Sequence, residues 1–292
     1  MVDDLLQNIR RIAVIGSGTM GSQISMACAL AGFETTVVDI VDEALEKAEA
    51  SLRSRMERDV SKGRRQQADV DAAFDRLSFS TDSDQVVSGA DVVIEAATEN
   101  LEIKRKLFAG FDQAAPEHTI LATNSSTIVS SQVADATNRA DKVCNFHFFN
   151  PALVMKAVEI VPNDQTSTYT IDVMCAVAQR LGKHVVQLHR EIPGFVANRL
   201  MNALRDEALN LYQAGIASYE DIDVAARDAL GHPMGPFELM DLVGIDVSYF
   251  IDMAEYDQTG QDAALPHPVL KEKYETGDYG RKTGRGWYNY EN

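Results

Sequence analysis

The chain has 292 residues, of which 45% are apolar and 24% are charged, values typical of a globular protein with a sizeable core. Its 27 basic and 44 acidic residues leave a net charge of −17, which excludes general nucleic-acid binding through a basic surface. No apolar run reaches the roughly 18 residues that a membrane span needs, and the first residues are polar rather than signal-like. The cysteines at positions 28, 144 and 175 have neither metal-ligand spacing nor a disulfide pattern, so we expect a cytoplasmic protein.

Short apolar runs alternate with helix-length amphipathic stretches up to about residue 190. The runs are rich in Val and Ile, as strands buried on both faces are. The expected strands are Arg11–Ile15, Thr35–Asp39, Asp91–Ala96, Ile120–Thr123, Val143–Phe149, Ala157–Val161 and His184–Leu188. The expected helices include Thr19–Ala31, Asp42–Lys62, Leu101–Ala115 and Tyr169–Leu181. This alternation predicts a mostly parallel sheet with helices on both faces.

The pattern changes after Leu188, because helical spacing continues without convincing strands. Val196, Leu200 and Leu204 recur at helical intervals, and Ser218 precedes a further helix with acids in its first turn. The sequence therefore predicts two domains, an α/β domain of residues 1–189 and an all-helical domain of residues 190–292.

A glycine motif, GSGTMG at residues 16–21, follows the first expected strand and opens a helix. In a dinucleotide site the first glycine permits a tight turn, the second lets the backbone approach a pyrophosphate, and the third allows close helix–strand packing. Asp39, 18 residues after the motif, can accept hydrogen bonds from the adenosine ribose, and its charge disfavours a 2′-phosphate. An ordinary glycine turn is the alternative interpretation. The sequence predicts a Rossmann-type site for NAD, and the residues expected there are Gly16, Gly18, Thr19, Met20, Gly21 and Asp39.

His147 and Glu159 are candidates for acid–base chemistry. Glu159 is the only charged residue in the run AVEIV, and a buried carboxylate is costly unless it is paired. An imidazole is a suitable partner, because a carboxylate orients the ring and raises its basicity. A structural hydrogen-bonded pair, or a histidine bonded to backbone, would explain the same residues. The six histidines show no metal-binding spacing, so no catalytic metal is expected.

Basic residues gather between Lys47 and Arg65, where seven of the 27 bases fall within 19 residues. On a helix, Ser51, Arg58 and Lys62 would share one face with Arg55. This face could bind a polyanionic ligand, or it could be a solvated face whose basic residues pair with the acidic residues of the same helix.

Several ordered motifs together resemble the 3-hydroxyacyl-CoA dehydrogenase family over nearly the whole chain. The matching stretches are IAVIGSGTMG, DVVIEAATENLEIKRKLF, ILATNSSTI, NFHFFNPALVMKAVEIV, PGFVANRL, EDID, GHPMGPFELMDLVGID and GRKTGRGWYNY. The resemblance implies NAD-dependent oxidation of a (3S)-3-hydroxyacyl-CoA to the 3-oxoacyl-CoA, with short acyl chains such as 3-hydroxybutyryl. It also implies a role in fatty acid or butanoate metabolism and a homodimer formed through the C-terminal domain.

Residue roles follow from the same resemblance. It implies that His147 is the general base, that Glu159 orients it, and that Ser126 and Asn198 hold the substrate. Further cofactor contacts are implied for Glu99, Lys104, Asn124, Ser126, Asn150 and Lys282, and coenzyme A contacts for Ser51 and Arg58. Two other functions remain open at this point. One is a dehydrogenase of a CoA-free hydroxy acid or sugar acid on the same fold, and the other is a dinucleotide-binding structural protein without turnover.

Overall fold

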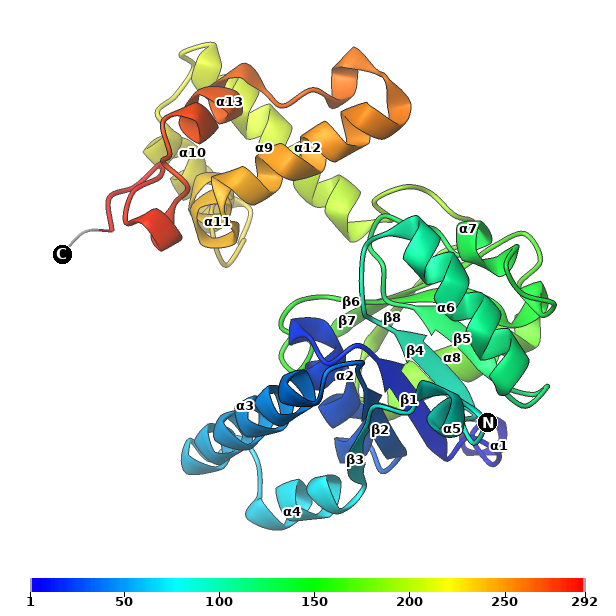
Figure 1. Ribbon diagram of the computed structural model, residues 1–292. Helices are drawn as coiled ribbons and strands as arrows, with labels where there is room; N and C mark the ends of the chain where they lie inside the picture. Colours follow the sequence, from blue (N-terminus) through cyan, green and yellow to red (C-terminus); the bar gives the residue numbers. More distant parts are fainter. Residues whose placement is uncertain (1, 291–292) are drawn as a thin grey trace. The chain divides into compact units, whose positions relative to one another are not determined.

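The computed structural model describes residues 2–290, apart from the side chains of residues 3, 258 and 259. These residues form two compact units that divide between Phe195 and Val196 (Figure 1). The sequence placed this boundary at His189. The difference arises because Phe195 packs with Leu188 and Val161 in a small apolar cluster of the first unit, which ties the residues after His189 to that unit.

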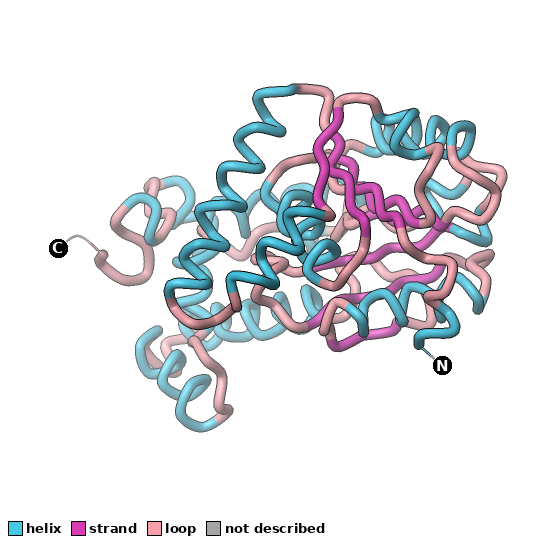
Figure 2. The backbone as a smooth tube through the Cα atoms, turned by 90° about the horizontal axis from the view of Figure 1, so that it is seen from below, coloured by secondary structure: helices cyan, strands magenta, loops and turns pink. Residues whose placement is uncertain are grey.

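The first unit is built on one eight-stranded sheet with the strand order β3-β2-β1-β4-β5-β6-β7-β8. The strands are the magenta segments in Figure 2. The strands are β1 (Arg11–Ile15), β2 (Glu34–Val38), β3 (Leu77–Ser80), β4 (Val92–Glu95), β5 (Ile120–Thr123), β6 (Val143–Phe148), β7 (Ala157–Pro162) and β8 (His184–Gln187). Strands β1 to β6 pair in parallel, β7 pairs antiparallel with β6, and β8 pairs in parallel with β7. The mostly parallel sheet of the prediction is thereby confirmed.

Helices cover both faces of this sheet. The helices of the first unit are α1 (Val2–Leu5), α2 (Thr19–Leu30), α3 (Asp42–Ser61), α4 (Gln67–Asp75), α5 (Ser83–Val87), α6 (Leu101–Ala114), α7 (Ser131–Ala134), the 3-10 turn η1 (Ala140–Lys142) and α8 (Thr168–Arg180). Successive strand residues point to opposite faces, so Ile12 packs with α2 and α8 whereas Ala13 packs with α5 and α6. Both faces are therefore apolar, as the Val- and Ile-rich runs predicted.

The expected elements of the first unit did not include strand β3, the short helices α1, α4, α5 and α7, or the turn η1. Strand β3 reads LSFS and lies at the edge of the sheet, where only Leu77 is buried. The apolar signal of this strand is weak, because a strand at the edge of the sheet buries few side chains. Helices α4 and α5 are short, and helices of that length leave little periodic signal.

The second unit consists of helices and turns within its described residues. They are α9 (Ala197–Gln213), α10 (Tyr219–Val224), a π-helical turn η2 (Ala225–Ala229), α11 (Pro236–Val243), α12 (Ile245–Thr259), η3 (Asp262–Ala264), α13 (Pro268–Glu275) and η4 (Arg281–Thr283). Ser218 caps α10 by accepting from the backbone N–H of Asp221 at 3.1 Å, as its position predicted. Asp241 accepts the backbone N–H groups of Trp287 and Tyr288, which fastens the C-terminal segment to the helical core. Within residues 2–290, no helix is long and apolar enough to cross a membrane.

Candidate active site and cofactor site

The glycine motif forms the turn between β1 and α2. Gly16 has a φ of +104°, and a Cβ there would lie 2.6 Å from the carbonyl oxygen of Ala96. At Gly21 a Cβ would lie 1.9 Å from the carbonyl oxygen of Gly16. No atom lies within 4 Å of a Cβ built on Gly18, so space is open beside the N-terminus of α2. The chain's own packing requires the outer two glycines, and the open space at the middle one fits a pyrophosphate.

Asp39 follows directly after β2 and is held from the neighbouring turn. Its Oδ2 accepts the backbone N–H of Ser17 at 2.9 Å and the Ser17 hydroxyl at 2.6 Å. Burial opposes the ionised form, but these hydrogen bonds outweigh burial and lower the pKa of Asp39 below its usual value. The result is a fixed, ionised carboxylate beside the glycine turn. The contact of Ser17 with Asp39 is not visible in the sequence, because the motif specifies its glycines and not the residue types between them.

His147 and Glu159 meet across β6 and β7. They are directly opposite in the antiparallel register, and His147 Nδ1 lies 2.8 Å from Glu159 Oε2. Glu159 is completely buried and His147 is 6% exposed. The imidazole packs against the rings of Phe149 and Phe195, with centroid distances of 4.7 and 5.4 Å. A carboxylate at Nδ1 favours the tautomer with a proton there, which leaves the Nε2 lone pair available to a substrate.

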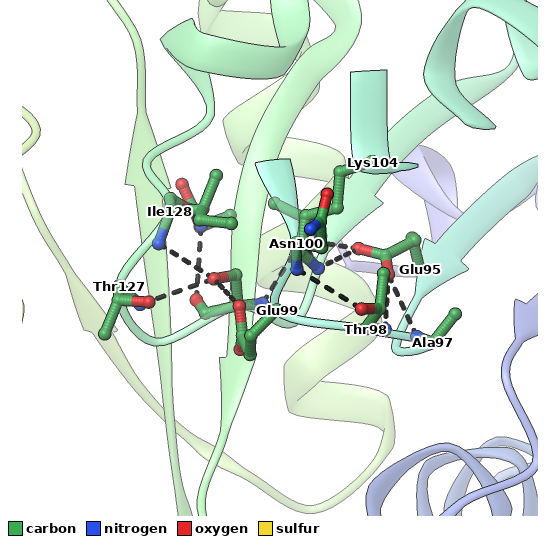
Figure 3. Close-up of polar contacts among 11 residues, drawn as sticks. Glu95, Ala97, Thr98, Glu99, Asn100, Lys104, Thr127 and Ile128 are labelled. Atoms are coloured by element: carbon green, nitrogen blue, oxygen red, sulfur yellow. Dashed lines mark hydrogen bonds and ion pairs between the residues drawn. The ribbon is translucent and has the colours of Figure 1, made fainter. Parts of the chain in front are cut away.

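The loop after β5 is fastened on both sides (Figure 3). The Ser125 hydroxyl donates to Glu99 Oε2 at 2.6 Å and accepts the backbone N–H of Ile128 at 2.9 Å. Asn124 Oδ1 accepts the backbone N–H of Phe148 at 2.9 Å, which ties this loop to the strand residue after His147. Ser126 is half-buried. These hydrogen bonds hold the loop that carries Ser126 next to the strand that bears the histidine.

Lys104 differs from its expected place at the cofactor surface. Its side chain is 1% exposed, and its ammonium forms an ion pair with the fully buried Glu95. The same ammonium lies 3.2 Å from Thr123 Oγ1 (Figure 3). The charge of Lys104 is therefore compensated inside this unit, and a direct contact of its ammonium with the cofactor stays a prediction.

The other expected site residues lie in four places. Asn150 is exposed and precedes Pro151, in a loop whose carbonyl groups at Ala152 and Met155 accept from the ammonium of Lys183 at 2.5 and 2.6 Å. Ser51 and Arg58 are exposed on α3. Asn198 lies in the first turn of α9, and the Lys282 ammonium is paired with Asp246. Both of these last residues belong to the second unit, so their contacts with the first unit's ligands stay a prediction.

Helix α3 separates an apolar face from a charged face. Leu45, Ala48, Leu52 and Met56 are its buried residues. Arg53 pairs with Glu49 at 2.6 Å, whereas the guanidinium of Arg58 makes no hydrogen bond or ion pair within residues 2–290. Arg58 is thus available to a ligand of opposite charge.

Sequence comparison identifies the family. Residues 11–192 match the NAD binding domain of 3-hydroxyacyl-CoA dehydrogenase, and residues 194–290 match its C-terminal domain. The chain belongs to the 3-hydroxyacyl-CoA dehydrogenase family. This confirms the resemblance, the Rossmann-type fold, an NAD-dependent oxidoreductase as the class of protein, and NAD as the cofactor.

Individual relatives match over almost their full length. The chain is 38% identical to a probable 3-hydroxybutyryl-CoA dehydrogenase of Bacillus subtilis, with 97% of this chain and 98% of that protein aligned. It is 38% identical to the mitochondrial hydroxyacyl-coenzyme A dehydrogenase of Sus scrofa, with 97% of this chain and 91% of the relative aligned. The crystal structure of (S)-3-hydroxybutyryl-CoA dehydrogenase from Ralstonia eutropha superposes with a TM-score of 0.90 at 36% identity, covering 98% of this chain and all of that chain.

Proposed function

We propose that the protein oxidises short-chain (3S)-3-hydroxyacyl-CoA thioesters to 3-oxoacyl-CoA with NAD, and catalyses the reverse reduction. The single observation that carries this proposal is the buried pair of His147 Nδ1 and Glu159 Oε2 at 2.8 Å. It lies in a chain whose relatives include proteins named for 3-hydroxybutyryl-CoA. A general base that is already paired with a carboxylate is what removal of a proton from a secondary alcohol requires.

In this mechanism each side chain has one task. NAD, when bound, supplies the hydride acceptor. His147 takes the proton of the substrate 3-hydroxyl at Nε2, and Glu159 stabilises the imidazolium that forms. Ser126 and Asn198 orient the reacting oxygen and the thioester, so they supply positioning rather than acid–base chemistry. In the reverse direction, the protonated His147 returns the proton to the oxygen at C3.

The cofactor would occupy the edge of the sheet where the parallel strands end. Gly16 to Gly21 would cradle the pyrophosphate, and Asp39 would accept from the adenosine ribose. Asn124, Glu99 and Asn150 would complete the site in the first unit, and Lys282 would contribute from the second. Open space at Gly18 and the fixed carboxylate of Asp39 support this placement.

The nucleotide end of coenzyme A would bind along α3. A protein with a net charge of −17 needs local positive charge to bind a polyanion, and Ser51 and Arg58 are exposed on this helix. Helical spacing places them on the same face as Lys62. The Arg58 guanidinium has no partner among residues 2–290. This supports a coenzyme A contact over the alternative, in which the basic residues of α3 pair with acidic residues of the same helix.

A homodimer formed through the second unit, located in the cytoplasm, completes the proposal. Large apolar side chains are exposed on α9, α11 and α12, among them Leu200 at 68%, Leu242 at 49% and Phe250 at 55%. Exposed apolar side chains in such numbers are typical of surfaces that bind another protein. Sedimentation analysis should therefore show particles of two chains, and a monomer at micromolar concentration would contradict the dimer.

One assay series tests the proposed substrate. Oxidation of NADH is followed with acetoacetyl-CoA, with longer 3-oxoacyl-CoA substrates, and with acetoacetate as the CoA-free control. We expect the highest kcat/KM for the four-carbon thioester and no turnover of acetoacetate. A preference for the free acid would favour the CoA-free dehydrogenase, and binding of NADH without turnover of any substrate would favour a structural protein.

A further inference from the structure

Glu95, Lys104 and Thr123 form a buried polar cluster that the proposed mechanism does not use. Glu95 ends β4, Thr123 ends β5, and Lys104 lies in α6. Glu95 and Thr123 are completely buried, and Lys104 is 1% exposed. The Glu95 carboxylate pairs with the Lys104 ammonium and accepts the Thr123 hydroxyl at 2.8 Å. The Glu95 and Thr123 side chains are thus completely enclosed by protein and can act on a ligand only through other residues.

The cluster is bonded to the backbone of two loops at the carboxyl end of the sheet (Figure 3). Glu95 Oε1 accepts the backbone N–H of Ala97 at 2.9 Å and of Thr98 at 3.4 Å. Thr123 Oγ1 accepts the backbone N–H of Ser125 at 3.2 Å. The first of these loops leads to Glu99 and the second to Ser126, and Glu99 and Ser125 are themselves hydrogen-bonded.

The first loop also lies against the glycine turn. A Cβ on Gly16 would lie 2.6 Å from the Cα of Ala97 and 2.6 Å from the carbonyl oxygen of Ala96. A shift of the turn after β4 would therefore displace the turn that is proposed to cradle the pyrophosphate. The cluster is thus bonded to two of the loops at the proposed cofactor site, and the first of these loops lies against the third.

Stability alone is a poor explanation for this cluster. Enclosing two charges costs desolvation energy, and apolar residues of similar volume often serve folding equally well. What such a cluster does provide is a defined loop geometry, because each oxygen accepts from specific donors. We propose that Glu95 and Thr123, which the Lys104 ammonium holds together, are positioning residues for NAD, and that they set the shape of the loops after β4 and β5. This inference rests on the proposed placement of the cofactor.

A matched set of threonine variants tests the inference. Thr123→Val removes the buried hydroxyl without changing the shape of the side chain, and Thr123→Ser restores it. The control is Thr119→Val. Thr119 is also completely buried, and its hydroxyl donates to the Ala90 carbonyl at 2.6 Å just before β5 begins, so this variant loses a buried hydrogen bond at the opposite edge of the sheet.

The readouts are the dissociation constant of NADH by fluorescence titration and the melting temperature. We expect Thr123→Val to weaken NADH binding about five- to tenfold, the effect of one hydrogen bond on an affinity. Thr123→Ser should bind within about twofold of the wild type. Thr119→Val should lower the melting temperature by a few degrees, as one lost hydrogen bond does, with unchanged affinity. If both valine variants lose stability alike and neither changes NADH affinity, the cluster serves folding only and the inference is wrong.

Two further measurements keep the test decisive. If Thr123→Val is not recovered folded, Thr123→Ala replaces it, since it removes the same hydroxyl and leaves the buried ion pair of Glu95 and Lys104 intact, and the same loss of NADH affinity is expected. Asp39→Ala probes the placement of the cofactor separately. Weakened NADH binding in Asp39→Ala together with unchanged binding in Thr123→Val would overturn the positioning role alone. Wild-type protein that binds no NADH would overturn the proposed function as well.

Discussion

Replacing Glu159 by Gln removes a buried negative charge opposite His147 while keeping the side chain's size. The contact is 2.8 Å long and Glu159 is completely buried, so solvent screens the lost interaction little. A hydrogen bond to a charged group is worth about 1.5–3 kcal/mol, and about 1.4 kcal/mol corresponds to a factor of ten in rate. We therefore expect kcat with acetoacetyl-CoA to fall about ten- to a hundredfold in Glu159→Gln, and about 10²- to 10⁴-fold in His147→Gln, the range for a positioned base.

The double variant decides whether the two residues act as a unit. If Glu159 acts only through His147, the double variant should be no slower than His147→Gln. His118 and Asp91 form a second histidine–carboxylate pair at 3.0 Å and serve as a control. This pair lies where β4 and β5 begin, at the edge of the sheet opposite the proposed active site. Asp91→Asn should leave kcat unchanged. Losses that multiply in the double variant, or a kcat in His147→Gln above half that of the wild type, would refute the proposed roles.

Three further outcomes are expected. The charge of Asp39 should favour NADH over NADPH about tenfold or more in kcat/KM, since a 2′-phosphate would meet a fixed carboxylate. Arg58→Ala should raise the KM for acetoacetyl-CoA several-fold, with a smaller effect at high salt because exposed charges are screened over about 10 Å at 0.1 M. The control variant Arg53→Ala should leave this KM unchanged, because the Arg53 guanidinium already pairs with Glu49 in the wild type. Asp91→Asn should lower the free energy of unfolding at pH 6 but much less at pH 3, as measured by urea denaturation.

The sign of the last prediction follows from the hydrogen bonds of Asp91. Burial opposes ionisation of its carboxyl, but bonds from the backbone N–H groups of Arg11 and Arg10 outweigh burial and lower its pKa in the folded state. The stabilisation is present above the unfolded value of about 3.9 and is lost as the pH falls through the folded value. An Asp91→Asn deficit that is equal at both pH values would contradict this reasoning.

The predictions for Asp39 and Arg58 can each be contradicted by one result. Equal catalytic efficiency with NADH and NADPH would show that Asp39 does not face the ribose. Equal impairment of Arg58→Ala on the full thioester and on a truncated thioester without the nucleotide end would show that α3 is a solvated helix.

The strands with the strongest apolar runs were predictable from sequence. β1 and β5 have the bounds that their Val-, Ile- and Leu-rich runs indicate, because strands buried on both faces must be apolar throughout. The antiparallel direction of β7 was not among the expectations, although the connection of eight residues between β6 and β7 is too short for the crossover that a parallel pair needs. That direction is what sets His147 opposite Glu159.

The same sequence signal points to two buried carboxylates, and only one was recognised. Glu159 was singled out as the one charge in an apolar run, and Glu95 occupies an equivalent position in VVIE. The buried partner of Glu95 could not be found from spacing, because Lys104 lies on a helix where a lysine is ordinarily exposed. Only the packing of α6 against the sheet brings its ammonium to the carboxylate.

The most direct test of the proposed activity is the formation of NADH from the two enantiomers of 3-hydroxybutyryl-CoA. The enzyme should reduce NAD with the (3S) thioester and produce acetoacetyl-CoA in equal amount. The (3R) thioester should give a kcat/KM lower by at least about 10²-fold, because a base held on one side of the site reaches the hydroxyl of one enantiomer only. Equal rates with both enantiomers, or no NADH from either, would contradict the proposed function.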